Sequence, residues 1–240
     1  MDGHELSYAS GFIVTGPTGP LLITSRHVVT GRDQDTGTPL SASGGIPDNV
    51  LVTHNGSEKD AKGSDTLVIA SESLYDDSGA PRWFEHPILR DRADIVALPL
   101  TRLAGIELMP VTITHSSNPI SCRPTEMVSV VGYPFGRSGP GSLAIWAAGF
   151  IASEIGILWN GLPIILIDCR SRPGQSGSPV FAYRPSLFIR ENGELQVPVP
   201  GTAGYRFLGV YGGRIHPDSD IGMVWNADCL RELVDSTSRS

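Results

Sequence analysis

In residues 171–181, SRPGQSGSPVF, Ser176 and Ser178 stand beside closely spaced glycines and directly before an apolar run. Glycine adopts backbone conformations that other residues avoid, so this spacing predicts a sharp turn that leads into a strand. Such a turn either exposes the hydroxyl of Ser176 as a nucleophile or serves only as a connection. The choice depends on the partners that the rest of the chain supplies.

The composition predicts a folded, all-β chain. Its 240 residues are 40% hydrophobic and 18% charged, which is enough to bury a full core. The 28 glycines and 19 prolines lie without period among β-branched runs, and this mixture indicates short strands joined by tight turns. The net charge of −7, with no local cluster of Lys and Arg, argues against a nucleic-acid partner.

The N-terminus and the cysteines bear on the compartment. MDGHELSYAS lacks a basic region followed by an apolar stretch, and no segment approaches the length of a membrane span. We therefore expect a cytoplasmic protein without a membrane partner. The three cysteines, Cys122, Cys169 and Cys229, are an odd number without the spacing of metal ligands, so we expect reduced structural thiols and no metal or other cofactor.

Two groups of strands are expected along the chain. The first group is SGFIVTG, PLLITSRHVV, NVLVTHNG, DTLVIAS and ADIVALPL, with a hairpin turn at residues 16–19. The second group is EMVSVVGY, SLAIWAAGFIAS, LPIILIDC, GSPVFAY, YRFLGVYGG and DIGMVWN. We predict two six-stranded antiparallel Greek-key barrels, over residues 1–105 and 126–240, joined by a linker over 106–125.

The remaining segments complete this prediction. Long loops are expected at 31–48, 54–65 and 184–204, and RENGEL in the last of them favours a small hairpin. The tail NADCLRELVDS changes to a helical period and predicts a short C-terminal helix. Asn226 is placed to cap this helix, and Leu230, Leu233 and Val234 share one face of it.

A serine hydroxyl becomes a strong nucleophile when a histidine accepts its proton and a buried carboxylate orients that histidine. His27 closes the apolar run LLITSRHVV, where its ring can emerge at the rim between strands. Asp94 is a single acid at the mouth of the apolar strand in RADIVALPL. Taken one at a time, His27, Asp94 and Ser176 are better explained as a strand-end histidine, a turn cap and a loop serine. Jointly they predict a catalytic triad.

These motifs, in the order His, Asp, Ser, resemble those of the trypsin-like (chymotrypsin-fold) serine endopeptidases. TSRHVV resembles the family's T-A-A-H box, DIVALPL its D-I-A-L box and GQSGSP its G-D-S-G-G-P box. PGQSGSPV and VVGYPFG are most similar to the bacterial HtrA-type and glutamyl-endopeptidase-like branches. The resemblance covers about residues 8–235 and implies a double β-barrel, catalytic His27, Asp94 and Ser176, and a protein or peptide substrate. An α/β-hydrolase does not fit, because its G-x-S-x-G elbow needs glycine where Ser178 stands.

The resemblance also implies that the backbone N–H groups of Gly174 and Ser176 form an oxyanion hole. Gln175 departs from the family's secreted zymogens, which carry an aspartate there to pair with a newly cut N-terminus. No basic residue followed by I-V-G-G occurs near the start of the chain. We therefore expect no activation by N-terminal insertion, and regulation by a protein partner through the long loops stays open.

The same resemblance predicts where substrate binds. Arg170, six residues before the nucleophile, is expected at the base of the pocket for the P1 residue, which would then favour an acidic side chain. The segment VYGG, with Val210, Tyr211 and Gly212, is expected to line the pocket and pair with substrate backbone. The alternative is that Arg170 turns outward or pairs with Asp168.

Asp91 and the remaining histidines are expected to lie outside the site. Asp91 is expected to be solvated in a charged run, and we expect the remaining histidines on the surface or in loops: His4, His54, His86, His115 and His216. A catalytically silent or partner-activated binding module on the same fold is an alternative function. An HtrA-like quality-control assembly would be expected to carry a further C-terminal peptide-binding domain, so we favour an intracellular processing or regulatory protease.

Overall fold

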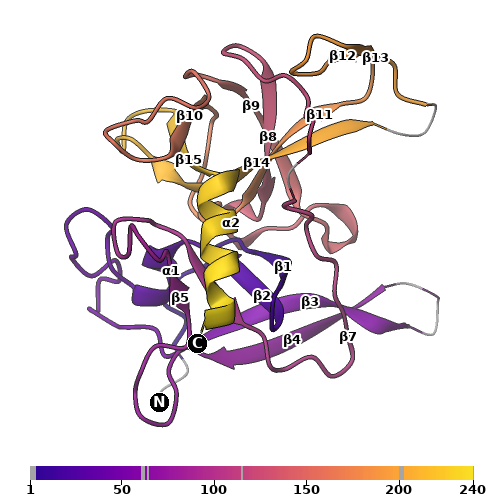
Figure 1. Cartoon of the computed structure of the whole chain (residues 1–240). Coiled ribbons are helices and arrows are strands. Elements are labelled where there is room, and N and C mark those ends of the chain that lie inside the picture. Colours follow the sequence, from indigo (N-terminus) through magenta and orange to yellow (C-terminus); the bar gives the residue numbers. More distant parts are fainter. Residues whose placement is uncertain (1–3, 61–62, 64, 115, 200–202, 240) are drawn as a thin grey trace.

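The computed structural model describes residues 4–60, 63, 65–114, 116–199 and 203–239 and confirms the all-β fold with a short C-terminal helix. Figure 1 shows two lobes, the first coloured indigo to purple and the second magenta to yellow, with α2 (Ala227–Ser236) running across both. The side chain of Asn226 accepts a hydrogen bond from the Cys229 N–H at 2.9 Å, as expected for a helix cap.

The first lobe holds seven strands in two sheets rather than one six-stranded barrel. One sheet has the order β1-β2-β6-β5 and the other β4-β3-β7. The division arises because β3 and β4 pair with each other along most of their length, and only the short β7 pairs with the other side of β3. The strands are β1 (Phe12–Gly16), β2 (Gly19–Thr24), β3 (Asn49–Lys59), β4 (Asp65–Ser73), β5 (Phe84–Glu85), β6 (Val96–Pro99) and β7 (Ile106–Glu107).

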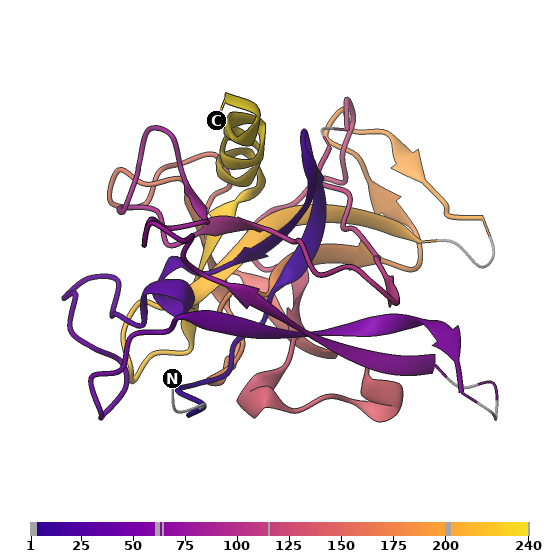
Figure 2. The same ribbon diagram turned by 90° about the horizontal axis from the view of Figure 1, so that it is seen from below.

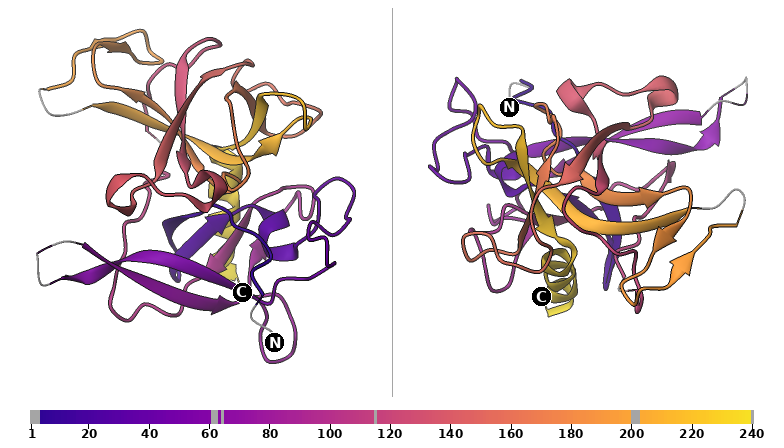
Figure 3. Two further views of the ribbon diagram at one scale, coloured as in Figure 1. Left: turned by 180° about the vertical axis from the view of Figure 1, so that it is seen from behind. Right: turned by 90° about the horizontal axis from the view of Figure 1, so that it is seen from above.

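The second lobe is a closed barrel with the order β10-β15-β14-β11-β8-β9, which confirms the six strands expected there. Figure 3 shows this barrel stacked on the first lobe when the molecule is seen from behind. The RENGEL hairpin is also present, as β12 paired with β13. The strands are β8 (Met127–Gly132), β9 (Ile145–Ile151), β10 (Ile164–Asp168), β11 (Pro179–Arg184), β12 (Phe188–Ile189), β13 (Leu195–Gln196), β14 (Gly204–Arg214) and β15 (Ile221–Asn226).

Two local expectations were wrong. The apolar run through His27 does not stay extended, because β2 ends at Thr24 and the short helix α1 (Arg26–Thr30) follows. Gly31 ends this helix with φ +64°, and its N–H bonds to the His27 carbonyl at 2.9 Å. Residues 54–59, expected in a loop, are the last part of β3, and residue 65 begins β4; these strands project from the lobe in Figure 2. Residues 61, 62 and 64 of the expected loop lie outside the described part.

The central strands are apolar on both faces because both faces are buried. In β2, Leu21 and Ile23 belong to a core cluster shared with α2, whereas Leu22 belongs to the core of the first lobe. Leu230 and Leu233 of α2 complete the shared cluster. Each such side chain stabilises the fold by about 1.5–3 kcal/mol on burial, so the helix holds the two lobes together.

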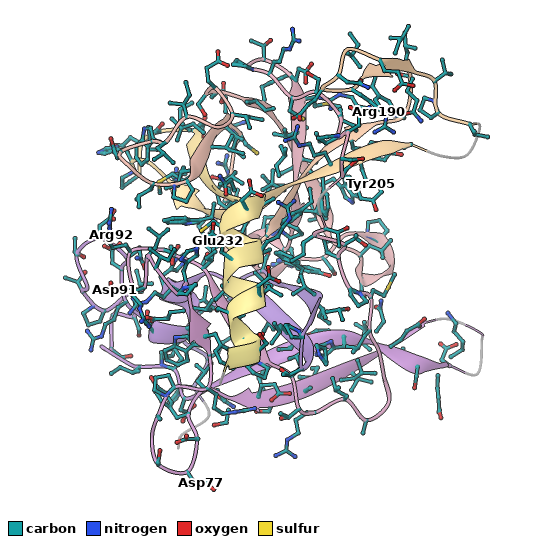
Figure 4. All side chains as sticks on the ribbon, in the orientation of Figure 1. Asp77, Asp91, Arg92, Arg190, Tyr205 and Glu232 are labelled. Carbon is teal, nitrogen blue, oxygen red and sulfur yellow. The ribbon has the colours of Figure 1, made fainter. Side chains whose placement is uncertain are left out.

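Two histidines expected on the surface or in loops are buried instead. His86 is 2% exposed, and its Nε2 lies 3.2 Å from the carboxylate of Glu232, which Figure 4 labels on α2. His54 is 6% exposed on β3. Burial lowers the pKa of both histidines, so each is held neutral at neutral pH. His4 and His216 are exposed as expected, and His115 lies outside the described residues.

Candidate active site

His27 and Asp94 meet because their strands are neighbours. Thr24 at the end of β2 pairs with Val96 at the start of β6, which brings the residues just beyond these ends together. His27 Nδ1 lies 2.7 Å from Asp94 Oδ2, and the His27 backbone N–H donates to Asp94 Oδ1 at 2.9 Å. Asp94 is 4% exposed, so its charge faces the histidine with little solvent.

This pair shifts the protonation of the histidine. Burial by itself lowers the pKa of His27, but the hydrogen bond to Asp94 and the charge of its carboxylate outweigh burial. The charge of Asp33 adds a further effect in the same direction. The pKa of His27 is therefore raised, and the site stabilises the imidazolium form.

The rival carboxylate, Asp91, does not enter the site. Asp91 and Arg92 are exposed in the loop before β6, where Figure 4 labels both. The Asp91 backbone carbonyl accepts a hydrogen bond from the Gln34 side chain at 2.5 Å. Asp94 is thus the carboxylate that the fold buries beside His27.

The turn from Pro173 to Ser178 is held through its carbonyl groups. Gly174 and Gly177 have φ of +92° and +85°, which side-chain-bearing residues rarely adopt. Four successive carbonyls accept hydrogen bonds: Pro173 O from Phe135 N–H at 2.6 Å, Gly174 O from Ser10 Oγ at 2.7 Å, Gln175 O from Ser178 N–H at 3.0 Å and Ser176 O from Ser10 N–H at 2.9 Å.

The N–H groups of the same turn fall into two sets. Gln175 N–H donates to Arg172 O at 3.2 Å, and Gly177 N–H donates to Tyr211 O at 2.8 Å. In the part of the chain that the structure describes, the N–H groups of Gly174 and Ser176 have no acceptor. These two N–H groups are the ones expected to form the oxyanion hole.

Of the two serines in the turn, only Ser176 has an accessible side chain. Ser178 is 0% exposed, and its hydroxyl has no hydrogen-bond partner. Ser176 is half-buried, and its turn packs against the end of β2: a Cβ added at Gly177 would lie 2.5 Å from Thr24 Oγ1. Ser176 thus lies beside the strand end that leads into His27. No hydrogen bond joins the Ser176 hydroxyl to any residue that the structure describes.

The expected substrate-binding strand runs beside this turn. A Cβ added at Gly212 would lie 3.5 Å from Asp94 Oδ2, so β14 passes close to the Asp94 carboxylate. The side chains of Val210 and Tyr211 are 0% and 2% exposed, and the Tyr211 hydroxyl donates to Ser171 Oγ at 2.5 Å. Tyr211 packs in the core of the second barrel and Val210 in the cluster shared with α2, so these two residues can offer a substrate only their backbone.

Arg170 is exposed just beyond the end of β10. This exposure is compatible with the alternative that Arg170 turns outward. The pair with Asp168 is not formed, and Arg170 makes no ion pair with any other described residue. Its guanidinium is therefore available to a ligand.

The cysteines take no part in this arrangement. Cys122, Cys169 and Cys229 are unpaired. Burial raises the pKa of all three thiols, to about 11 for Cys169 and about 12 for Cys229. Protonated thiols are poor nucleophiles, which fits their expected structural role.

The described residues contain no group of three or more His, Cys, Asp or Glu placed to hold a metal ion. They also contain no helix of the length and apolar character that crossing a membrane requires.

The two-lobed fold and the His27–Asp94 pair beside a glycine-rich serine turn define a trypsin-like serine protease. The sequence profile of the trypsin-like peptidase domain matches residues 9–187, and the chain belongs to this family of serine endopeptidases. No curated protein sequence matches the chain.

Solved structures of similar fold come from bacterial proteases. The serine endoprotease from Yersinia pestis is 13% identical with a TM-score of 0.51, and the match covers 100% of this chain and 61% of that chain. The Rv3671c protease from M. tuberculosis, in its active form, is 17% identical with a TM-score of 0.43 over 94% of this chain and 71% of that chain. The HtrA-type protease AlgW with a decapeptide is 16% identical with a TM-score of 0.47, and the match covers 96% of this chain and 51% of that chain. At these identities the similarity concerns the fold alone.

Proposed function

We propose that this chain hydrolyses peptide bonds through a triad of His27, Asp94 and Ser176 and a covalent acyl-enzyme intermediate. The observation that carries the proposal is that the Asp94 carboxylate accepts two hydrogen bonds from His27, one from the ring at 2.7 Å and one from the backbone at 2.9 Å. It fixes the ring with Nδ1 as the donor to the carboxylate, which leaves Nε2 to accept a proton.

In the proposed reaction, the Ser176 hydroxyl oxygen attacks the carbonyl carbon of the scissile peptide while His27 Nε2 takes the hydroxyl proton. Asp94 stabilises the imidazolium that forms. The oxygen of the tetrahedral intermediate gains negative charge and accepts hydrogen bonds from the N–H groups of Gly174 and Ser176. His27 then donates its proton to the leaving amine. A water molecule repeats the attack on the acyl-enzyme, releases the acid and restores the serine.

The substrate proposed is a protein or peptide with an acidic residue at P1. Support comes from Arg170, which is exposed and forms no ion pair within the described chain. A guanidinium binds a carboxylate through charge-assisted hydrogen bonds. The buried side chains of Val210 and Tyr211 leave backbone pairing as the other source of substrate affinity.

The proposed setting is a reducing compartment, where the protein acts as a processing or regulatory protease. The three unpaired cysteines support this setting, since disulfides form and persist in oxidising compartments. Activity is then expected to be the same with and without dithiothreitol. A large loss on reduction would contradict the proposed setting.

Labelling with a fluorophosphonate probe tests the triad directly. We expect the probe to modify the wild-type chain at Ser176 and to leave Ser176→Ala unmodified. Ser178→Ala is the matched control, because it removes a buried hydroxyl that has no hydrogen-bond partner in the same turn. Equal labelling of wild type and Ser176→Ala would refute the assignment. A wild type that neither labels nor digests a peptide library would favour a silent binding module.

A further inference from the structure

Ser10 occupies the point where the N-terminal segment passes between the two lobes, directly before Gly11 and β1. It is 4% exposed and makes four hydrogen bonds. Its partners belong to both lobes: Thr24 Oγ1 donates to Ser10 O at 2.8 Å, Ser10 N–H donates to Ser176 O at 2.9 Å, Ser10 Oγ donates to Gly174 O at 2.7 Å and Tyr133 N–H donates to Ser10 Oγ at 2.9 Å.

The hydroxyl of Ser10 fixes the peptide that follows Gly174. A serine hydroxyl has one proton to donate, and here that proton goes to the Gly174 carbonyl. Because the peptide group is planar, holding the Gly174 carbonyl also sets the direction of the Gln175 N–H on the other side of the same peptide. Ser10 N–H holds the carbonyl of Ser176 in the same way.

The same hydroxyl also secures the peptide that precedes Gly174. It accepts the Tyr133 N–H and so fastens the 3₁₀ turn Pro134–Gly136 beside the active site. Phe135 in this turn has φ +55°, and its N–H holds the Pro173 carbonyl at 2.6 Å. The Pro173–Gly174 peptide therefore directs its carbonyl toward Phe135 and its N–H the opposite way.

These constraints matter because Gly174 has no side chain to limit rotation of its backbone. If the Pro173–Gly174 peptide rotated, the Pro173 carbonyl could replace the Gly174 N–H where the intermediate gains negative charge, and rotation of the Gly174–Gln175 peptide would displace the backbone between Gly174 and Ser176. Gln175 carries no charge, so it cannot hold the turn through an ion pair as the aspartate of the secreted zymogens does. Its Oε1 accepts the Arg172 N–H at 2.6 Å, a bond within the turn itself.

We infer that Ser10 is a positioning residue, which keeps the 173–176 turn in the form that leaves the N–H groups of Gly174 and Ser176 without an acceptor in the resting protein. The inference rests on the proposed hydrolase function. An uncharged hydroxyl inside the chain would thereby do what a charged, newly cut N-terminus does in the secreted zymogens.

Ser10→Ala tests this role through the split between kcat and KM. We expect kcat to fall about tenfold to a hundredfold with KM within about twofold, because oxyanion hydrogen bonds act mainly in the transition state. Ser153→Ala is the matched control. The Ser153 hydroxyl accepts the Leu166 N–H at 2.9 Å in the second lobe and makes no hydrogen bond to the turn, so its loss should leave kcat unchanged.

A second variant covers the case in which Ser10→Ala does not fold. Thr24→Val keeps the shape of the side chain and removes only the hydroxyl that donates to the Ser10 carbonyl. We expect it to lower kcat by a smaller factor, about threefold. A kcat for either folded variant equal to that of wild type would overturn the inference, and so would a loss that appears only as a higher KM.

Crystal structures separate this inference from the proposed function. In Ser10→Ala, we expect a rotated peptide at Pro173–Gly174 or Gly174–Gln175, and in Ser153→Ala an unchanged turn. An unrotated turn in Ser10→Ala overturns the positioning role whether or not the protein is active. A wild type that fails to label at Ser176 contradicts the hydrolase function instead.

Discussion

Asp94 bonds both the ring and the backbone of His27, at 2.7 Å and 2.9 Å. A carboxylate bonded only to the ring would leave the histidine free to move with its helix, whereas the second bond ties α1 to the strand β6. The orientation of the imidazole is therefore set by the pairing of β2 with β6 and not by α1 alone.

The two hydrogen bonds between His27 and Asp94 predict a severe defect for Asp94→Asn. The amide can keep similar contacts, but it carries no charge to stabilise the imidazolium and can favour the wrong tautomer of His27. We expect kcat to fall by about 10³–10⁴ while the protein stays folded. Steady-state kinetics with a cleaved peptide would measure this fall. Asp91→Asn is the control on an exposed aspartate, and a kcat for Asp94→Asn above a tenth of the wild-type value would contradict the triad.

The raised pKa of His27 predicts the pH dependence of activity. Only neutral His27 can accept the serine proton, so kcat/KM should rise as the pH increases through the pKa of this histidine. Because Asp94 outweighs burial and raises that pKa, the acid limb should have its midpoint above the ordinary histidine value of about 6.5. A pH profile of kcat/KM measures the midpoint. A limb at or below the ordinary value would mean that burial, and not Asp94, dominates.

The sequence motifs predicted the class of fold and the meeting of His27 with Asp94, but not the local structure that produces it. Periodicity favoured a continuous strand through His27, because Val28 and Val29 have strand propensity. The helical turn of α1 is closed by Gly31 in the left-handed region, a local effect that overrides this propensity. Tyr211 was expected to contact substrate because sequence order cannot tell which face of a strand points into a closed barrel.

Ser10 shows a second limit of the sequence. It lies in YASGF, a segment without any motif for catalysis, and three of its hydrogen-bond partners follow more than 100 residues later in the chain. Only the packing of the N-terminal segment between the lobes brings them together. Its neighbours Ala9 and Gly11 give no sign of this role, so the residue could be recognised only from the structure.

Gly174→Ala should change the backbone conformation of the turn from Pro173 to Ser178. At φ +92°, a Cβ would lie 2.7 Å from Tyr133 O and 2.9 Å from Phe135 N, so the turn or the 3₁₀ loop must move. We expect kcat to fall about a hundredfold or more, since the Gly174 N–H would leave its position.

Gly156→Ala is the control for this prediction. Gly156 has φ +90°, and a Cβ added there meets no atom within 4 Å. The control carries the same backbone strain without the clash, so it should lose stability but keep kcat. Equal activity of the two variants, measured on folded protein, would show that the Gly174 conformation is not needed for hydrolysis.

Arg170→Ala should change the choice of P1 residue and spare the chemistry. If the exposed guanidinium meets the substrate, glutamate at P1 gains a charge-assisted hydrogen bond that glutamine lacks, and we expect about a tenfold preference in kcat/KM. Peptide-library digestion with mass-spectrometric readout measures this preference. Arg170→Ala should abolish it while hydrolysis at small uncharged P1 residues continues, because His27, Asp94 and Ser176 are unchanged.

Arg92→Ala, which changes an arginine on an exposed loop, is the control and should keep the wild-type P1 preference. Cleavage after small aliphatic or basic residues in the wild type would contradict the pocket assignment and leave the triad assignment intact.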